Sequence, residues 1–156
     1  MDHVCGSRLV LGLGSGFSVP ETEEEFRAVR AEFSGRAGRL DGTVALWHTA
    51  WQRPEDGGSV DFTGRHFQAE GLDRLPPPHG PGGPPLWLAG SGTPRVVERV
   101  ARHYDGWMPF LPYARAYGEA RDRVQRTREA AGRRTPSRPP CTTRSPSTRT
   151  PHGRAP

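Results

Sequence analysis

Hydrophobic residues along this chain form short continuous runs and one-sided stripes, the two patterns that distinguish strands from helices. The apolar run at 9–13 predicts a strand covered on both faces, as the strands of parallel sheets are. Shorter apolar segments at 86–89 and 106–108 predict two further strands. Short alternating segments at 60–62 and 66–68 predict an inserted β-hairpin.

Stripes of apolar residues spaced by three and four predict helices between and after these strands. Pro20 and an acidic run at 21–25 predict a helix start, because negative charge is favourable near a helix N-terminus. Further helices are expected at 36–51, from Pro94 onwards, and at 113–131, where Gly132 ends the helix. The inward stripes are Leu40, Val44, Trp47 and Trp51; then Val96, Val97, Val100 and Ala101; and finally Tyr117, Ala120, Val124 and Ala131.

The order of these elements predicts an α/β fold with three principal parallel strands. The Pro/Gly-rich segment 75–85 is expected to be an extended surface connection before the second main strand. Three parallel strands leave two open sheet edges, which natural proteins seldom tolerate. Either the chain pairs with another copy or partner, or it is one piece of a larger sheet.

Two turns of small residues follow predicted strands, at 14–16 and at 90–93. The second turn opens a helix, with Thr93 as the expected N-cap and Pro94 as the first helical residue. First-turn N–H groups have no intrahelical partner, so such a turn can hold an anion. The same pattern is also typical of an ordinary strand-to-helix connection, and the turn alone does not choose between the two.

Composition divides the chain near residue 132. Residues 133–156 contain six Arg, six Pro and no acidic residue, so they cannot bury enough apolar surface to offset the entropy of ordering. We therefore expect a folded domain at 1–132 and a disordered tail at 133–156. The net charge of +5 resides in this tail, and residues 1–132 carry 16 Arg against 17 acids. Specific nucleic-acid binding is not expected, since the body has no basic face.

Cysteine and histidine positions indicate neither a disulfide framework nor a metal site. Cys5 and Cys141 lie far apart, and no metal-ligand spacing surrounds either residue. Four histidines, His48, His66, His79 and His103, are scattered along the chain without ligand spacing. The sequence shows no signal peptide and no apolar run of about 20 residues, so we expect a cytoplasmic protein without a membrane span.

Taken in order, a set of short motifs resembles the luciferase-like monooxygenases, including the oxidoreductases that use the deazaflavin coenzyme F-420. The resemblance covers roughly residues 2–132, and each piece is weak when taken alone. The motifs are Asp2-His3, Gly6-Ser7-Arg8-Leu9, Gly12-Leu13-Gly14-Ser15-Gly16-Phe17, Glu25-Phe26, Arg36, Arg39-Leu40-Asp41, Phe62-Thr63-Gly64-Arg65-His66-Phe67, Pro84-Pro85-Leu86-Trp87-Leu88-Ala89-Gly90-Ser91-Gly92 and Asp105-Gly106-Trp107-Met108-Pro109.

This resemblance implies an incomplete (β/α)8 TIM barrel of about three consecutive βα units, its strands four to six. It also implies a cofactor, FMN or coenzyme F-420, across the barrel mouth, and redox or monooxygenase chemistry on a small organic substrate. The cofactor-binding residues implied are Gly14, Ser15, Gly16, Gly90, Ser91, Gly92 and Thr93. Trp107 and Met108 end a strand at the same rim and are expected to line the pocket, with core packing as the alternative for Trp107. Catalytic residues stay unassigned, because the family's acid/base residues lie largely on strands absent here.

Two interpretations of the whole chain follow. The first is a truncated luciferase-like oxidoreductase with little activity alone. The alternative is a non-catalytic partial barrel that binds or assembles, completing its sheet with another chain. The tail resembles GC-rich coding sequence read out of frame, because a one-base shift from Thr135 can yield a strand-like and helix-like segment. The gene's nucleotide sequence tests this interpretation.

Overall fold

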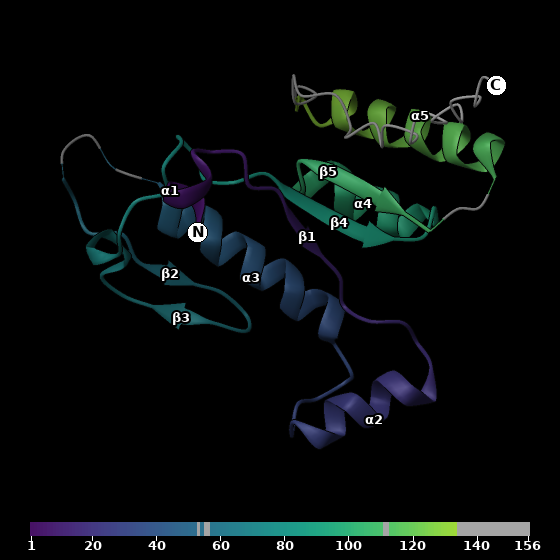
Figure 1. Cartoon of the computed structure of the whole chain (residues 1–156), viewed down its shortest axis with the longest axis horizontal. Helices are drawn as coiled ribbons and strands as arrows, with labels where there is room; N and C mark the ends of the chain where they lie inside the picture. Colours follow the sequence, from purple (N-terminus) through teal and green to yellow (C-terminus); the bar gives the residue numbers. More distant parts are fainter. Residues whose placement is uncertain (53, 55–56, 111–112, 134–156) are drawn as a thin grey trace, which may run out of the picture.

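A three-stranded parallel sheet organises the fold, with strand order β1-β4-β5. The computed structural model describes residues 1–52, 54, 57–110 and 113–133, so most of the predicted tail lies outside the described residues. The elements are α1 Asp2–Cys5, β1 Leu11–Leu13, α2 Pro20–Ala28, α3 Arg36–Trp51, β2 Phe62–Thr63, β3 Gln68–Ala69, the 3-10 helix Leu72–Arg74, β4 Leu86–Gly90, α4 Pro94–His103, β5 Gly106–Pro109 and α5 Ala114–Ala130 (Figure 1).

The parallel α/β class predicted from the sequence is confirmed, together with the β4-α4-β5 unit. Leu88 pairs with Leu13 of β1 on one side and with Trp107 of β5 on the other. The second helix prediction, 36–51, matches α3 in both bounds. This arrangement is consistent with part of a barrel.

One face of the sheet carries the main hydrophobic core. Leu86 and Leu88 of β4 are almost fully buried and pack with Val97 and Val100 of α4 and with Tyr104. Helices α3 and α5 contribute Val44 and Val124 to the same cluster. Because strand residues alternate between faces, Trp87, Ala89, Gly12 and Met108 occupy the opposite face.

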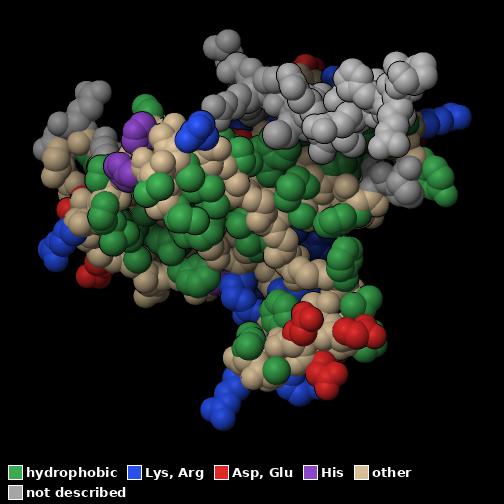
Figure 2. All heavy atoms as spheres, viewed as in Figure 1, with side chains coloured by type: hydrophobic (Ala, Val, Ile, Leu, Met, Phe, Trp, Pro, Cys, Tyr) green, Lys and Arg blue, Asp and Glu red, His purple; other side chains and the backbone are tan. Residues whose placement is uncertain are grey.

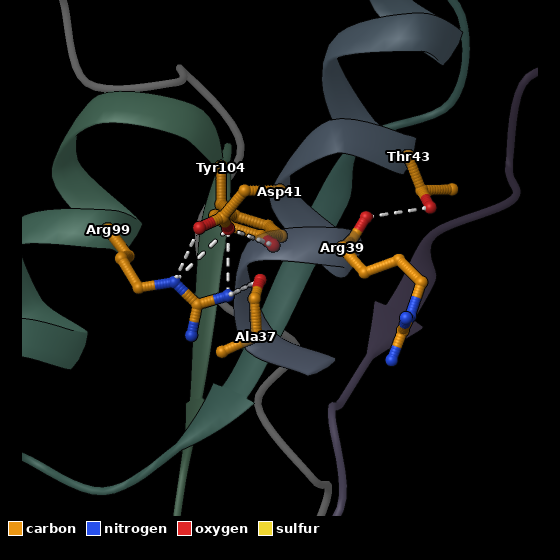
Figure 3. Close-up of polar contacts among 6 residues, drawn as sticks. All are labelled: Ala37, Arg39, Asp41, Thr43, Arg99 and Tyr104. Carbon is orange, nitrogen blue, oxygen red and sulfur yellow. Dashed lines mark hydrogen bonds and ion pairs between the residues drawn. The ribbon is translucent and has the colours of Figure 1, made fainter. Parts of the chain in front are cut away.

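A carboxylate on α3 joins this helix to α4 across the core. Asp41 accepts hydrogen bonds from Arg99 Nε and Nη2, the latter at 2.7 Å, and from the Tyr104 hydroxyl at 3.0 Å (Figure 3). Arg99 Nη2 also donates to the Ala37 carbonyl. Burial lowers the pKa of Arg99, but hydrogen bonding to Asp41 and its negative charge produce a net increase. Arg99 is not one of the four inward residues of the predicted stripe on this helix, yet it is half-buried in this ion pair.

The hairpin forms later in the chain than predicted, with β2 at Phe62–Thr63 and β3 at Gln68–Ala69. Val60 is buried instead in a second small cluster with Ala50 and Leu72. Its carbonyl accepts the Leu72 N–H, and its own N–H donates to a carboxylate oxygen of Asp73. These bonds remove Val60 from strand pairing.

Helix α5 ends in a Schellman motif, one residue earlier than predicted, and the inward position expected for Ala131 is wrong. Gly132 adopts φ +68°, its N–H binds the Glu129 carbonyl, and the Arg133 N–H binds the Arg128 carbonyl. Ala131, predicted to face inward, lies beyond the helix and is exposed. Arg128 is buried instead, and donates to the Tyr104 carbonyl at 2.7 Å.

The surface of the described residues divides by side-chain type. Figure 2 shows hydrophobic side chains gathered over the middle of the face in view, while acidic side chains lie on α2. Figure 1 shows α2 projecting away from the sheet. Within the described part of the chain, no helix combines the length and apolar character needed to cross a bilayer.

Candidate functional site

The two predicted glycine turns meet at one edge of the sheet. Strands β1 and β4 are parallel neighbours, so the turn 14–16 and the turn 90–93 both follow carboxyl ends at the same rim. A Cβ added at Gly14 would lie 3.7 Å from the Ala89 Cβ, which places the start of the first turn directly beside the end of β4. All seven predicted site residues are half-buried or exposed.

Local geometry disfavours a side chain at two of these glycines. Gly16 has φ +78°, a conformation that L side chains rarely adopt. A Cβ at Gly90 would lie 3.0 Å from Val96 Cγ1, because the first turn of α4 packs closely on the end of β4. The turns therefore use glycine for backbone shape and for close approach.

The N-terminus of α4 carries no side-chain cap. Thr93 occupies the N-cap position with an extended backbone, as predicted, but its side chain makes no capping bond. Its Oγ1 lies instead 3.3 Å from Ser91 Oγ. Pro94 has no N–H, so the first-turn N–H groups without an intrahelical carbonyl are those of Arg95 and Val96. This leaves positive dipole and amide donors at the rim, the features that favour anion binding.

Donors from β5, from the residue after it and from α5 bind the carbonyl groups of the second turn. The Gly90 carbonyl accepts from Trp107 Nε1 at 3.2 Å and from the Phe110 N–H at 3.4 Å. The Gly92 carbonyl accepts from Arg123 Nη1 on α5 at 3.4 Å. These contacts fix the turn, and Arg123 adds a cation near it. No sequence motif marks Arg123, since the contact joins residues 31 positions apart.

Of the two readings of Trp107, core packing is the one observed. Its ring stacks on Tyr117 of α5, with ring centroids 6.0 Å apart, and packs against the main core. Met108 faces the other side of the sheet, where its Cε lies over Gly12. Trp107 therefore supports the second turn, whereas Met108 lies on the face that opens towards the rim.

The four histidines do not gather at one site, although two of them share a hollow. His48 and His103 line a hollow of about 280 Å³ with Arg102, and this hollow lies beside the amino ends of β4 and β5. His79 Nδ1 lies 2.8 Å from Ser7 Oγ. Among the described residues, no group of three or more His, Cys, Asp or Glu side chains is placed to hold a metal ion.

A family model and curated relatives both match this chain. The family model described as luciferase-like monooxygenase matches residues 1–152. F-420-dependent glucose-6-phosphate dehydrogenases from Mycobacterium leprae and Rhodococcus erythropolis are 30% and 34% identical over 102 and 101 residues. Each alignment covers 65% of this chain and 28% of the relative, so the chain spans less than a third of these relatives' length.

Solved structures agree on the fold. Monooxygenase RslO1 from Streptomyces bottropensis superposes with a TM-score of 0.67 at 23% identity, covering 85% of this chain and 39% of that one. Riboflavin lyase RcaE, solved with modified FMN and riboflavin, gives a TM-score of 0.55 at 18% identity, covering 70% and 29%. From the family match over nearly its whole length, the chain belongs to the luciferase-like monooxygenase family.

Proposed function

We propose that this chain supplies the cofactor-phosphate end of a flavin- or F-420-dependent oxidoreductase acting on a small organic substrate. The family and the named activity of the relatives support the reaction class. When bound, reduced FMN supplies oxygen activation, and F-420 supplies hydride exchange with a substrate carbon. F-420 is favoured by the names of the curated relatives, and FMN by the ligand named with riboflavin lyase.

The observation that carries this proposal is the uncapped start of α4 beside a second glycine turn. Residues 90–93 would hold the cofactor's phosphate through backbone N–H groups and the helix dipole. Arg123 stands close enough to add charge at that end. Gly14, Ser15 and Gly16 would let the rest of the cofactor approach the backbone of the neighbouring strand.

Comparing FMN with riboflavin, which lacks the phosphate, tests the assignment directly. The wild-type chain should bind FMN more tightly than riboflavin in a fluorescence titration, and F-420 more tightly than its phosphate-free riboside. Ser91→Asp places a negative charge in the turn, and one like charge about 4 Å away costs about 1 kcal/mol in a water-like dielectric. We therefore expect about fivefold weaker FMN binding and an unchanged affinity for riboflavin.

Ser34→Asp is the matched control, because Ser34 is exposed in the segment between α2 and α3. It should leave both affinities unchanged. Equal FMN and riboflavin affinities in a folded wild-type sample would refute phosphate binding at the turn. So would an equal effect of both substitutions on FMN binding.

The same proposal places the chain as three consecutive βα units of a barrel, with little turnover alone. The relatives are more than three times longer than the aligned region, and barrel active sites draw residues from several strands. Cofactor binding should therefore be measurable where turnover is not. Turnover by the isolated chain at a rate typical of enzymes would contradict this placement.

A second candidate function is an assembly module that completes its sheet with another copy. Its support is that β1 and β5 are both edge strands of the three-stranded sheet that the described residues form. Sedimentation at several protein concentrations distinguishes the two. A stable dimer with cooperative unfolding favours assembly, and a folded monomer that binds FMN or F-420 excludes it.

A further inference from the structure

Two phenylalanines from different loops meet above the sheet at the candidate site. Phe17 follows β1 and Phe110 follows β5, the two strands that flank β4. Their ring centroids are 5.2 Å apart with planes tilted by 52°. The side chains meet across the carboxyl end of β4, and yet they remain 60% and 55% exposed. Two aromatic rings with free surface at a strand-end rim are typical of a ligand-contacting patch.

The loops around this pair hold no charged residue in their described parts. Asp, Glu, Lys, Arg and His are absent from positions 14–19, 91–93, 110 and 113. Charged side chains begin on the helices instead, at Glu21 of α2, Arg95 of α4 and Arg115 of α5. A charged group placed beside the phenylalanine pair would lose hydration without gaining an ion pair, which is costly.

The sheet face that leads up to this pair is also uncharged. It presents Gly12 of β1, Gly14 just after that strand, Trp87 and Ala89 of β4, and Met108 of β5. Glycine and alanine leave little side chain above β1 and the end of β4, and Trp87 and Met108 supply apolar surface. The sheet face and the described loop residues around the pair are thus uncharged, and the polar features nearby are the amide donors at the start of α4 and the Arg123 guanidinium beside the Gly92 carbonyl.

We propose that Phe17 and Phe110 contact the substrate and select a neutral aromatic molecule over a sugar phosphate. This inference rests on the proposed function, since it assigns the start of α4 to the cofactor's phosphate and the phenylalanine pair to the substrate. It separates this chain from the curated relatives, which are named as glucose-6-phosphate dehydrogenases.

The test titrates the full chain with 2-naphthol, a neutral fluorescent aromatic probe, and with glucose 6-phosphate. Phe17→Ala and Phe110→Ala should each weaken naphthol binding by about three- to tenfold, the range expected for losing one aromatic contact. Phe33→Ala is the matched control, because Phe33 also belongs to a phenylalanine pair, with Phe26 at a centroid distance of 5.4 Å. It should leave naphthol affinity unchanged, and glucose 6-phosphate should neither bind nor displace naphthol.

Three outcomes would overturn the inference. The first is equal naphthol affinity in the wild type and all three variants. The second is displacement of naphthol by glucose 6-phosphate. The third is loss of self-association in the Phe17 and Phe110 variants, which would identify a second copy of the chain as the occupant of this surface. FMN and F-420 are titrated in parallel. If naphthol binding responds as expected but neither cofactor binds, the proposed cofactor site fails while the aromatic site stands.

Discussion

Replacing Asp41 with asparagine should destabilise the fold strongly, because one carboxylate joins α3 to α4. Asp41 accepts from two nitrogens of Arg99 and from the Tyr104 hydroxyl. Asparagine keeps one acceptor oxygen but turns an amide N–H₂ towards the guanidinium and removes the compensating charge. Breaking a buried ion pair costs about 3–5 kcal/mol. The side chains of Arg99 and Asp41 keep 15% and 26% of their exposure, so solvent screens part of this effect.

We therefore expect Asp41→Asn to lower the free energy of unfolding by about 2–3 kcal/mol. This is a large share of a typical domain's 5–15 kcal/mol. Urea unfolding followed by tryptophan fluorescence is a suitable assay, because Trp47, Trp51 and Trp107 pack against the main core and should report its loss.

The matched control is Glu119→Gln on α5. Glu119 also pairs with an arginine Nε, that of Arg115 at 3.0 Å, but these side chains are 61% and 92% exposed. Surface pairs of this kind contribute less than about 1 kcal/mol. If Asp41→Asn and Glu119→Gln change the unfolding free energy equally, the carboxylate does not couple the two helices as the structure indicates.

Three further predictions concern Tyr104, the glycines and the tail. Burial, followed by the charge and hydrogen bonding of Asp41, raises the pKa of Tyr104 above its usual 10.0. As the pH rises above about 10, the unfolded chain therefore loses the tyrosine proton before the folded chain does, and the free energy of unfolding falls. Tyr104→Phe should flatten that fall in urea titrations from about pH 9 to about pH 11, and an unchanged slope would contradict it. Gly90→Ala should cost about 1–2 kcal/mol through its contact with Val96, whereas Gly118→Ala, which meets no atom within 4 Å, should stabilise α5 by about 0.5–1 kcal/mol. A thermal scan in which both glycine variants shift the same way would contradict this. Deleting residues 134–156 should leave the thermal midpoint unchanged, and loss of the cooperative transition would refute the predicted domain boundary.

Local signals predicted the elements that depend on neighbouring residues. The stripe in 36–51 specified α3, and Pro20 marked the start of α2, because helix periodicity and capping act within a few positions. The meeting of the turns at 14–16 and 90–93 was also predictable, since parallel neighbours end at the same edge. The cofactor role of these turns stays a prediction.

Contacts between distant residues were beyond such reasoning. Asp41 and Arg99 are 58 positions apart, and both look like ordinary solvent-exposed helix residues in the sequence. The hairpin begins later than predicted for a similar reason. The polar and apolar residues around Val60 alternate as in a strand, but its backbone groups form hydrogen bonds with Leu72 and Asp73 instead of with a neighbouring strand. Thr93 shows the limit of capping rules. It occupies the predicted N-cap position, but its side chain makes no capping hydrogen bond.

Among the described residues, the small cluster of Ala50, Val60 and Leu72 packs the hairpin region against α3, separately from the main core. The first residue of β4 is held independently, since Leu86 exchanges hydrogen bonds with Asp105 through its N–H and its carbonyl. Segment 54–75 can therefore change in length and sequence during evolution without moving the strands that carry the rim. Diversity among natural variants of this chain should concentrate in this segment, leaving the carboxyl end of the sheet unaltered.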